Sequence, residues 1–263
     1  MGRLLHFETR KLFRQTSFYV CLAVLLALVF VGIFSTYSLL RIAQSELGVE
    51  MNLADLALFT DSQLNARGYL FSALSGNNFL LLAGIFTALF ICSDYVGGTA
   101  KNVIGRGFSR ASYLNAKLLV CEGGILLYAV CCCAFSFLMA TLYYGAGKNW
   151  EVRDLLQLLI QFLIVLAYGA FFSFLSLLTK KSGASLALNI MAPVVISTVL
   201  GLVDIFVEKK EIAFSDYWLA GCLTKASNLS TETGDLMQCG IVAAVYLIVF
   251  VLLSHLLVRR QDV

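Results

Sequence analysis

Long apolar runs separated by short polar segments dominate the pattern along this chain. A helix needs about 20 apolar residues to cross the hydrocarbon core of a bilayer. We predict spans at Phe18–Leu39, Asn78–Cys92, Leu118–Tyr143, Leu155–Leu178, Ala184–Phe206 and Gln238–Leu257. The second span is the shortest and is allowed to begin earlier, near Gly68. Because the runs are continuous rather than alternating, they argue against the strands of a membrane barrel. We therefore expect an all-α, polytopic membrane protein with six transmembrane helices.

Composition supports this fold class and narrows the partners. The chain has 263 residues, of which 60% are hydrophobic and only 13% charged. Its mean hydropathy is +0.86, far from that of a soluble domain. The net charge of +3 gives no reason to expect a nucleic-acid partner. No repeat or composition break divides the chain, so we expect one transmembrane domain over residues 1–263, with the lipid bilayer as its surroundings.

The basic residues predict the orientation in the membrane. With the N-terminus inside, the inner segments hold Arg3, Arg10, Lys11, Arg14, Lys101, Arg106, Arg110, Lys117, Lys180, Lys181, Arg259 and Arg260. The outer segments hold Arg41, Arg67, Lys148, Arg153, Lys209, Lys210 and Lys225. Loops on the cytoplasmic side carry the excess of Lys and Arg. We therefore expect a multi-pass protein of the plasma membrane with both termini in the cytoplasm.

Residues 1–16 have the pattern of an amphipathic helix. One side gathers Leu5, Thr9, Leu12 and Phe13, and the other gathers Arg3, Arg10, Lys11 and Arg14. Such a helix lies in the headgroup plane with its basic side toward anionic lipid or a partner. The alternative is that these cations only anchor the topology of the first span.

Catalytic chemistry is poorly supported by the residues present. The only histidines are His6 and His255, at opposite ends of the chain, and no acid, base and nucleophile converge. No complete phosphate-binding loop occurs. We expect neither an enzyme, nor a metal site, nor a cofactor bound by this chain itself.

Three residues inside the spans are candidates for a transport pathway or a hinge. Glu122 is the one carboxylate well inside a predicted span, and such groups are functional candidates; the alternative is a structural pair with a nearby cation. Pro193, the only proline, removes a backbone hydrogen bond near Asn189. It predicts either a gating hinge or a static kink that shapes packing.

The segment between the second and third predicted spans is unusual. Ser93–Leu119 carries four basic residues, one acid and several glycines between two greasy runs. Val96-Gly97-Gly98 ends the span, and Thr99 is an expected N-cap for a short helix through about Ile104. An amphipathic helix laid in a groove is a common way to bind a partner. A solvated positive loop that serves topology alone is the plainer alternative.

Residues 94–119, D-Y-V-G-G-T-A-K-N-V-I-G-R-G-F-S-R-A-S-Y-L-N-A-K-L-L, resemble the first cytoplasmic loop of ABC type-2 permeases. That pattern has an acid-aromatic pair, then G-T-x-K-N, then serine-arginine and a closing K-L-L. The acid is more often Glu in the family, so Asp94 departs mildly from it. The stretch E-T-R-K-L-F-R-Q-T-S-F-Y-V at residues 8–20 also resembles the N-terminal helix of the family.

The resemblance implies a half-transporter that works with a second permease chain, identical or different, and with cytoplasmic ABC ATPase subunits. Those subunits would bind ATP and Mg and hydrolyse the ATP. Residues 97–110 would form the coupling helix region. The positions implied for coupling are Asp94, Tyr95, Gly98, Thr99, Lys101, Asn102, Val103, Ile104, Arg106, Phe108 and Arg110.

On this resemblance we expect an ATP-driven exporter permease, of the bacterial type that moves amphipathic or antimicrobial peptides and toxins out of the cell. An ion-coupled carrier or channel is the alternative. It would show midplane charges or broken helices in matched positions, and only Glu122 and Pro193 come near that pattern.

Overall fold

The computed structural model confirms an all-α membrane protein. It describes residues 2–47, 65–146, 150–207 and 213–260, and every regular element in these ranges is helical. Within this part of the chain, six helices are long and apolar enough to cross a membrane. They are α2 (Thr16–Leu47), α5 (Asn77–Val96), α7 (Arg110–Tyr144), α8 (Val152–Thr179), α9 (Ser182–Phe206) and α11 (Thr233–Arg260).

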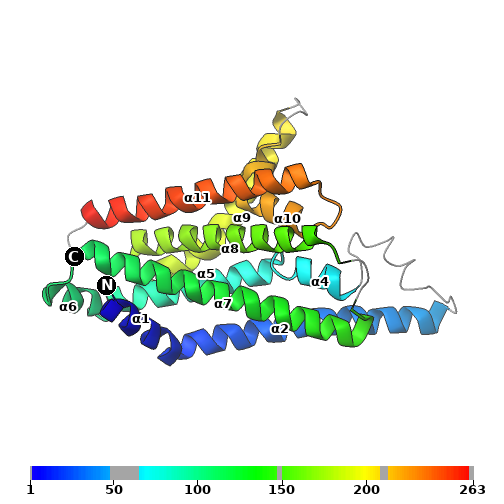
Figure 1. Ribbon diagram of the computed structural model, residues 1–263, viewed down its shortest axis with the longest axis horizontal. Coiled ribbons are helices and arrows are strands. Elements are labelled where there is room, and N and C mark those ends of the chain that lie inside the picture. Colours follow the sequence, from blue (N-terminus) through cyan, green and yellow to red (C-terminus); the bar gives the residue numbers. More distant parts are fainter. Residues whose placement is uncertain (1, 48–64, 147–149, 208–212, 261–263) are drawn as a thin grey trace.

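Shorter helices lie at the two ends of the bundle. α1 (Gly2–Arg14) and α6 (Thr99–Gly105) lie at one end, and α4 (Ala66–Ser72), η1 (Phe214–Tyr217) and α10 (Leu219–Ser227) belong to the segments at the other. The segment near Gly68 is therefore a separate helix, α4, because residues 73–76 turn before α5 begins. Both chain ends and α6 lie at the same end of the molecule (Figure 1).

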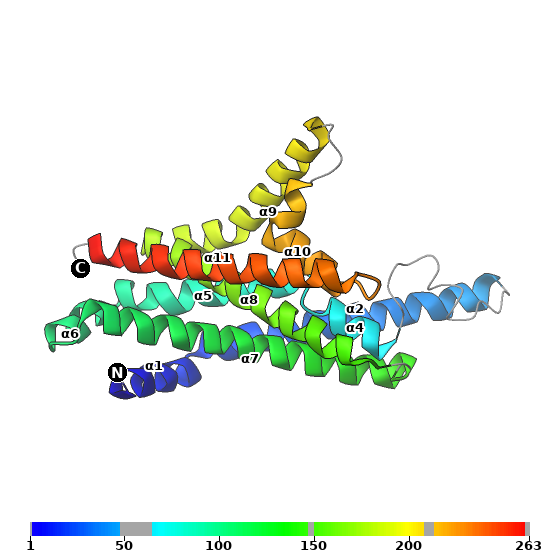
Figure 2. The ribbon, with the colours of Figure 1, turned by 45° about the horizontal axis from the view of Figure 1, so that its top comes forward.

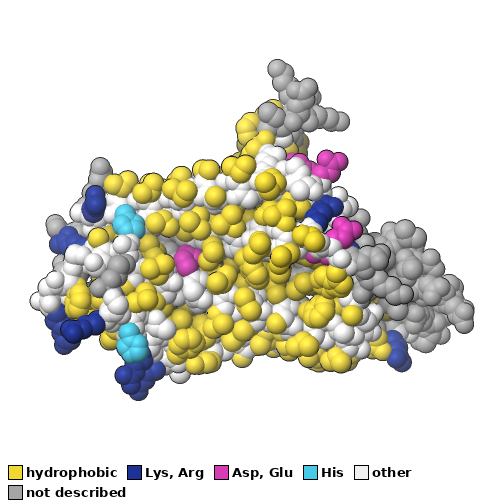
Figure 3. Space-filling view, in the orientation of Figure 1, with side chains coloured by type: hydrophobic (Ala, Val, Ile, Leu, Met, Phe, Trp, Pro, Cys, Tyr) yellow, Lys and Arg dark blue, Asp and Glu magenta, His cyan; other side chains and the backbone are white. Residues whose placement is uncertain are grey.

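The long helices run side by side, except for α9. Figure 2 shows α9 leaving the bundle at an angle while α5, α7, α8 and α11 stay roughly aligned. The only buried residues of α9 are Ser185 and Asn189, both in its first half. Hydrophobic side chains cover the middle of the face in Figure 3, and many of the Lys and Arg side chains gather at the end that holds α6 and the termini.

An aromatic cluster joins α2 to the central helices. Phe18 of α2 is buried against Phe86 of α5 and Tyr128 of α7, with ring centroids 5.7 and 5.0 Å away. The Tyr128 hydroxyl donates to the Phe18 carbonyl oxygen at 2.6 Å. This bond satisfies a phenol that would otherwise be buried without a partner.

Two glutamines of α8 hydrogen-bond to α4 and α10, the short helices at the end of the bundle opposite α6. Gln161 Nε2 donates to the carbonyl oxygens of Phe71 and Ala226, both at 2.8 Å. Gln157 Nε2 also donates to the Ala226 oxygen, at 2.7 Å. Carbonyls at helix ends need such partners where water is scarce, so α4 and α10 are held against the bundle.

Candidate functional site

The connection between α5 and α7 contains the predicted short helix. The structure has α6 at Thr99–Gly105, so the helix is confirmed, while its start differs by one position. Thr99 is its first residue rather than its N-cap, and the Gly98 carbonyl accepts from Asn102 N at 3.3 Å. Gly98 has a φ of 67° and Gly107 a φ of 88°. These left-handed backbones suit glycine and no β-branched residue, and they turn the chain before and after α6.

The positively charged side chains of the connection between α5 and α7 lie on its exposed side. Lys101, Asn102 and Arg106 are exposed, and Phe108 is exposed to 37%. Val103 and Arg110 are half-buried. Ile104 lies in α6, but its side chain is outside the described part of the chain. Two cations and one aromatic ring therefore point out from the end of the bundle that holds both termini.

Asp94 does not belong to this exposed surface. Its side chain is fully buried, and both carboxylate oxygens are occupied. Oδ1 contacts the Lys11 ammonium, and Oδ2 contacts the Lys117 ammonium and accepts from the Tyr113 hydroxyl at 2.8 Å. A buried charge with this many partners is stable, and a partner protein has no access to it.

The same cluster takes in a second acid from the N-terminal helix. Lys117 Nζ lies 3.1 Å from Glu8 Oε2, and it also lies over the Phe90 ring, 3.9 Å from the centroid. Glu8 is fully buried and Lys117 is 2% exposed. We call Glu8, Lys11, Asp94, Tyr113 and Lys117 the ionic clamp, because it joins α1, the end of α5 and the start of α7.

The clamp balances two acids with two cations. Burial, and the positive charge of Lys117, lower the pKa of Lys11 to about 8, while Glu8 opposes them. Lys11 therefore stays mostly protonated at pH 7. Lys11 Nζ also donates to Ser93 Oγ at 3.3 Å, so its ammonium spans from α1 to the last turn of α5.

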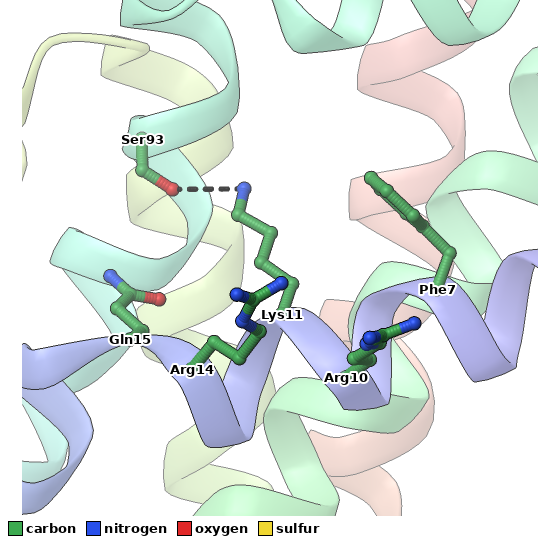
Figure 4. A pocket seen from close by; sticks show the side chains of 6 residues that line it. All are labelled: Phe7, Arg10, Lys11, Arg14, Gln15 and Ser93. Carbon is green, nitrogen blue, oxygen red and sulfur yellow. Dashed lines mark hydrogen bonds between the residues drawn. The ribbon is translucent and has the colours of Figure 1, made fainter.

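A basic hollow lies beside the clamp. It has a volume of about 510 Å³, and Phe7, Arg10, Lys11, Arg14 and Gln15 of the N-terminal segment line it together with Ser93. Figure 4 shows Lys11 reaching across toward Ser93, while Arg10 and Arg14 lie beside it on α1 and its continuation. The predicted helix within residues 1–16 is present as α1, which ends at Arg14.

α1 contacts the bundle through Leu4, Glu8 and Leu12. Of the predicted apolar side, Leu12 is buried against the bundle, whereas Leu5 is 39% and Phe13 is 47% exposed. The apolar pattern did not indicate the contacts of Glu8 and Lys11, which face inward because they pair with Lys117 and Asp94.

The clamp fixes both ends of the α6 connection. Asp94 precedes Gly97 by three residues, and Tyr113 and Lys117 lie in the first turns of α7. The Ser109 side chain caps α7 by accepting from Ser112 N at 3.2 Å. A force applied to α6 would therefore reach α5, α7 and α1 together.

Tyr95 and Asn189 lie on the other side of α5. Tyr95 is half-buried, and the Lys180 ammonium lies 5.4 Å from its ring centroid. Asn189 Nδ2 donates to the Gly84 carbonyl at 3.0 Å and to Ser176 Oγ at 3.1 Å. Its Cβ lies 3.3 Å from the point where Gly84 would carry one, so α9 and α5 approach closely here.

Pro193 lies four residues beyond Asn189, inside α9. The helix continues through it, and none of the α9 residues after Asn189 is buried. Val194, Val195 and Val199 are 49–59% exposed. Asn189 therefore anchors α9, and Pro193 lies where the buried part of α9 ends, a position that suits both the hinge and the kink.

Glu122 is separate from the clamp. Neither of its carboxylate oxygens has a hydrogen-bond partner in the described part of the chain, although both are buried. The predicted alternative of a structural ion pair is therefore not found there. Lys117, the cation nearest in sequence, is five residues away and faces α1 and α5.

Sequence reasoning missed Glu8, Tyr113 and the inward role of Lys11. The available signal was an acid, Glu8, in an otherwise basic N-terminal helix, together with Asp94 and Lys117 at the edges of apolar runs. Charges of opposite sign at membrane boundaries on different helices pair readily. Among the described residues, no group of three His, Cys, Asp or Glu side chains is placed to hold a metal ion.

These features define the class: an all-α, multi-pass membrane protein with a buried ionic cluster and an exposed short helix at one end. Residues 28–263 match the family described as "Protein of unknown function (DUF2705)", and the chain belongs to that family. Comparison with curated proteins gives no match.

Proposed function

We propose that this chain is the transmembrane permease subunit of an ATP-driven exporter, coupled through α6 to separate cytoplasmic ABC ATPase subunits. The ATPase subunits would bind ATP and Mg, and a second permease chain would complete the transporter. The cargo that fits the family resemblance is an amphipathic or antimicrobial peptide leaving a bacterial cell. In this arrangement both termini and α6 face the cytoplasm.

The observation that carries the proposal is the way α6 is mounted. α6 and the turn that follows it expose Lys101 and Arg106, with Phe108 nearby, at the end where the basic residues gather. Its two flanks are held by the ionic clamp and by the Ser109 cap. A loop that only connected two spans would not need buried charges at both ends, since burying them is costly.

The contacts that hold the ends of the α6 connection are suited to transmit motion from α6 to the bundle. Binding can shift a protein between two states only if the partner contacts those states differently. An ATPase that moved α6 would move Asp94 and Lys117, and through them α1. The helices of the bundle would then shift as connected bodies rather than one by one.

Charge reversal at Arg106 tests the proposal. The full-length chain is expressed with its cassette ATPase, and export is measured as the concentration of an amphipathic antimicrobial peptide that the cells withstand. We expect Arg106→Glu to insert normally and to keep hydrolysing ATP, while export falls at least about tenfold, because reversed charges in an interface repel.

Lys181→Glu is the matched control. Lys181 is an exposed cation in the short α8–α9 turn, which lies on the same side of the membrane as α6 because two spans, α7 and α8, separate the two along the chain. This variant should leave export unchanged. The proposal fails if Arg106→Glu exports normally, or if no cassette ATPase purifies with the wild-type chain in mild detergent.

A further inference from the structure

A second cavity lies between α7, α8 and α11, away from the clamp. Its volume is about 360 Å³, and Leu118, Leu166 and Leu247 give it apolar walls. Glu122 is the one acid that lines it, and Asn115 and His255 are its other polar residues. Pockets of this size with few polar groups are typical of small-molecule sites.

Glu122 is the unusual member of this cavity. Both of its carboxylate oxygens are buried and have no hydrogen-bond partner among the described residues. A buried carboxylate without a partner is costly, and inside a membrane it is rarer still. A proton or a counter-charge would relieve this cost, and the described residues place no hydrogen-bonding cation at the carboxylate.

The polar pair at the cavity makes no hydrogen bond to Glu122. His255 Nε2 lies 2.6 Å from Asn115 Oδ1, and His255 Nδ1 lies 2.9 Å from the Val251 carbonyl oxygen. Both ring nitrogens are thus engaged with other groups. Asn115 precedes Glu122 by seven residues on α7, about 10 Å along the helix axis. The cavity is therefore polar at Asn115 and His255 and carries its acid about two helical turns deeper.

Gly169 of α8 makes room for the carboxylate. A Cβ at this position would lie 2.3 Å from Glu122 Oε2 and 2.8 Å from Ile125 Cδ1. Real side chains do not tolerate such distances. Any other residue at 169 would displace Glu122, so the packing of α8 against α7 preserves the place of this acid.

We propose that this cavity binds a hydrophobic amine, with Glu122 as the counter-ion of its ammonium group. The apolar walls take the hydrophobic body, and the single carboxylate takes one positive charge. A metal ion fits less well, because hard cations need several oxygen ligands. Among the described residues no cluster of three ligating side chains surrounds Glu122.

The binding itself does not rest on the proposed function; only its use as a station for exported cargo does. The test uses the full-length chain in nanodiscs of phosphatidylcholine, whose headgroups carry no net charge. The probe is tritiated 1-adamantanamine, and 1-adamantanol is its uncharged counterpart. We expect saturable binding of the amine and binding of the alcohol at least about tenfold weaker, since the charge-assisted contact is lost.

Three variants complete the test. Glu122→Gln should weaken amine binding at least about tenfold while the melting midpoint stays at or above that of wild type. Leu166→Phe, which fills a half-buried wall of the cavity, should weaken it as well. Glu232→Gln, the same chemical change at an exposed position, should not alter it.

Equal binding of amine and alcohol, full binding by Glu122→Gln, or the absence of saturable binding by wild type would each overturn the proposal. The two proposals fail separately. A chain that binds the amine but recruits no ATPase keeps this site and loses the exporter assignment. A chain that exports peptide but binds no amine loses only this site.

Discussion

Two buried carboxylates, Asp94 and Glu122, illustrate opposite ways of placing an acid in a membrane protein. Asp94 is surrounded by two ammonium groups and a phenol. Glu122 has buried oxygens without a partner in the described part of the chain. The helix α7 provides both Lys117 and Glu122, five residues apart. A helix turns about 500° over five residues, so the two side chains face different neighbours.

The difference indicates that the buried charged groups of this bundle serve two separate roles, one in holding helices together and one beside a cavity. The clamp pairs its acids with its own cations, so it holds elements together, although Glu8 Oε1 has no hydrogen-bond partner among the described residues. Glu122 has no hydrogen-bond partner among the described residues, and its side chain lines a cavity. Replacing a member of the clamp should therefore harm the fold, whereas replacing Glu122 should leave the fold intact or make it more stable.

The largest expected effect comes from Asp94→Asn. This change leaves Lys11 and Lys117 facing each other with only Glu8 to balance them. Removing one partner of a buried ion pair costs about 3–5 kcal/mol. The measurement is the free energy of unfolding in mixed micelles, followed by circular dichroism.

Asp216→Asn serves as the comparison for Asp94→Asn. Asp216 forms a 2.8 Å ion pair with Lys225, and these two side chains are 39% and 33% exposed. Surface pairs contribute about 0–1 kcal/mol. If the two Asn variants lost the same free energy, the clamp would not be the anchor that we describe.

A smaller effect of opposite sign is expected for Glu122→Met. The replacement keeps a similar length and removes a buried group that lacks a partner. Relieving an unsatisfied buried polar group is worth about 1–3 kcal/mol, so we expect the protein to be more stable by about 1–2 kcal/mol. The same micelle titration measures it, with Glu8→Gln as the buried acid that should instead lose stability. A clear destabilisation by Glu122→Met would reveal a partner for the carboxylate.

The smallest effect is expected for Ser109→Ala, which removes the cap of α7. Loss of an N-cap costs about 1 kcal/mol, and here the clamp still holds both ends of the connection. Hydrogen exchange of the first-turn amides of α7 should speed up, while the exchange of α5 stays as it is. Ser35→Ala, an exposed hydroxyl that bonds within its own helix, should change neither. Faster exchange along α5 as well would mean that the cap, and not the clamp, carries the connection.

The sequence was sufficient to predict the membrane-spanning helices and α6. Continuous apolar runs mark the spans because lipid requires about 20 such residues, and Gly97-Gly98 marks the break before α6. The ends of the spans were less accurate. α7 begins at Arg110 rather than near Leu118, because Tyr113 and Lys117 find buried partners and let the helix extend past the apolar run.

The clamp could not be read from the sequence. Its members Lys11 and Asp94 are 83 residues apart, and Lys117 and Glu8 are 109 apart. Periodicity within one helix says nothing of such pairings. Glu122 was conspicuous as a lone acid in a greasy run, but only the packing of α8 and α11 around it decides whether it is paired, and Gly169 is noticeable only once α8 is in place.

The large sequence separation between paired residues of the clamp also constrains the biosynthesis of the protein. Glu8 leaves the ribosome 109 residues before Lys117, which at about 5–20 residues per second is an interval of roughly 5–20 seconds. During that time Glu8 on α1 lacks its ion-pair partner Lys117, and α1 remains at the membrane surface. The Glu8–Lys117 pair can form only after the third span has been synthesised. Formation of this pair can therefore act as a checkpoint in biogenesis, passed only after half of the bundle has entered the bilayer.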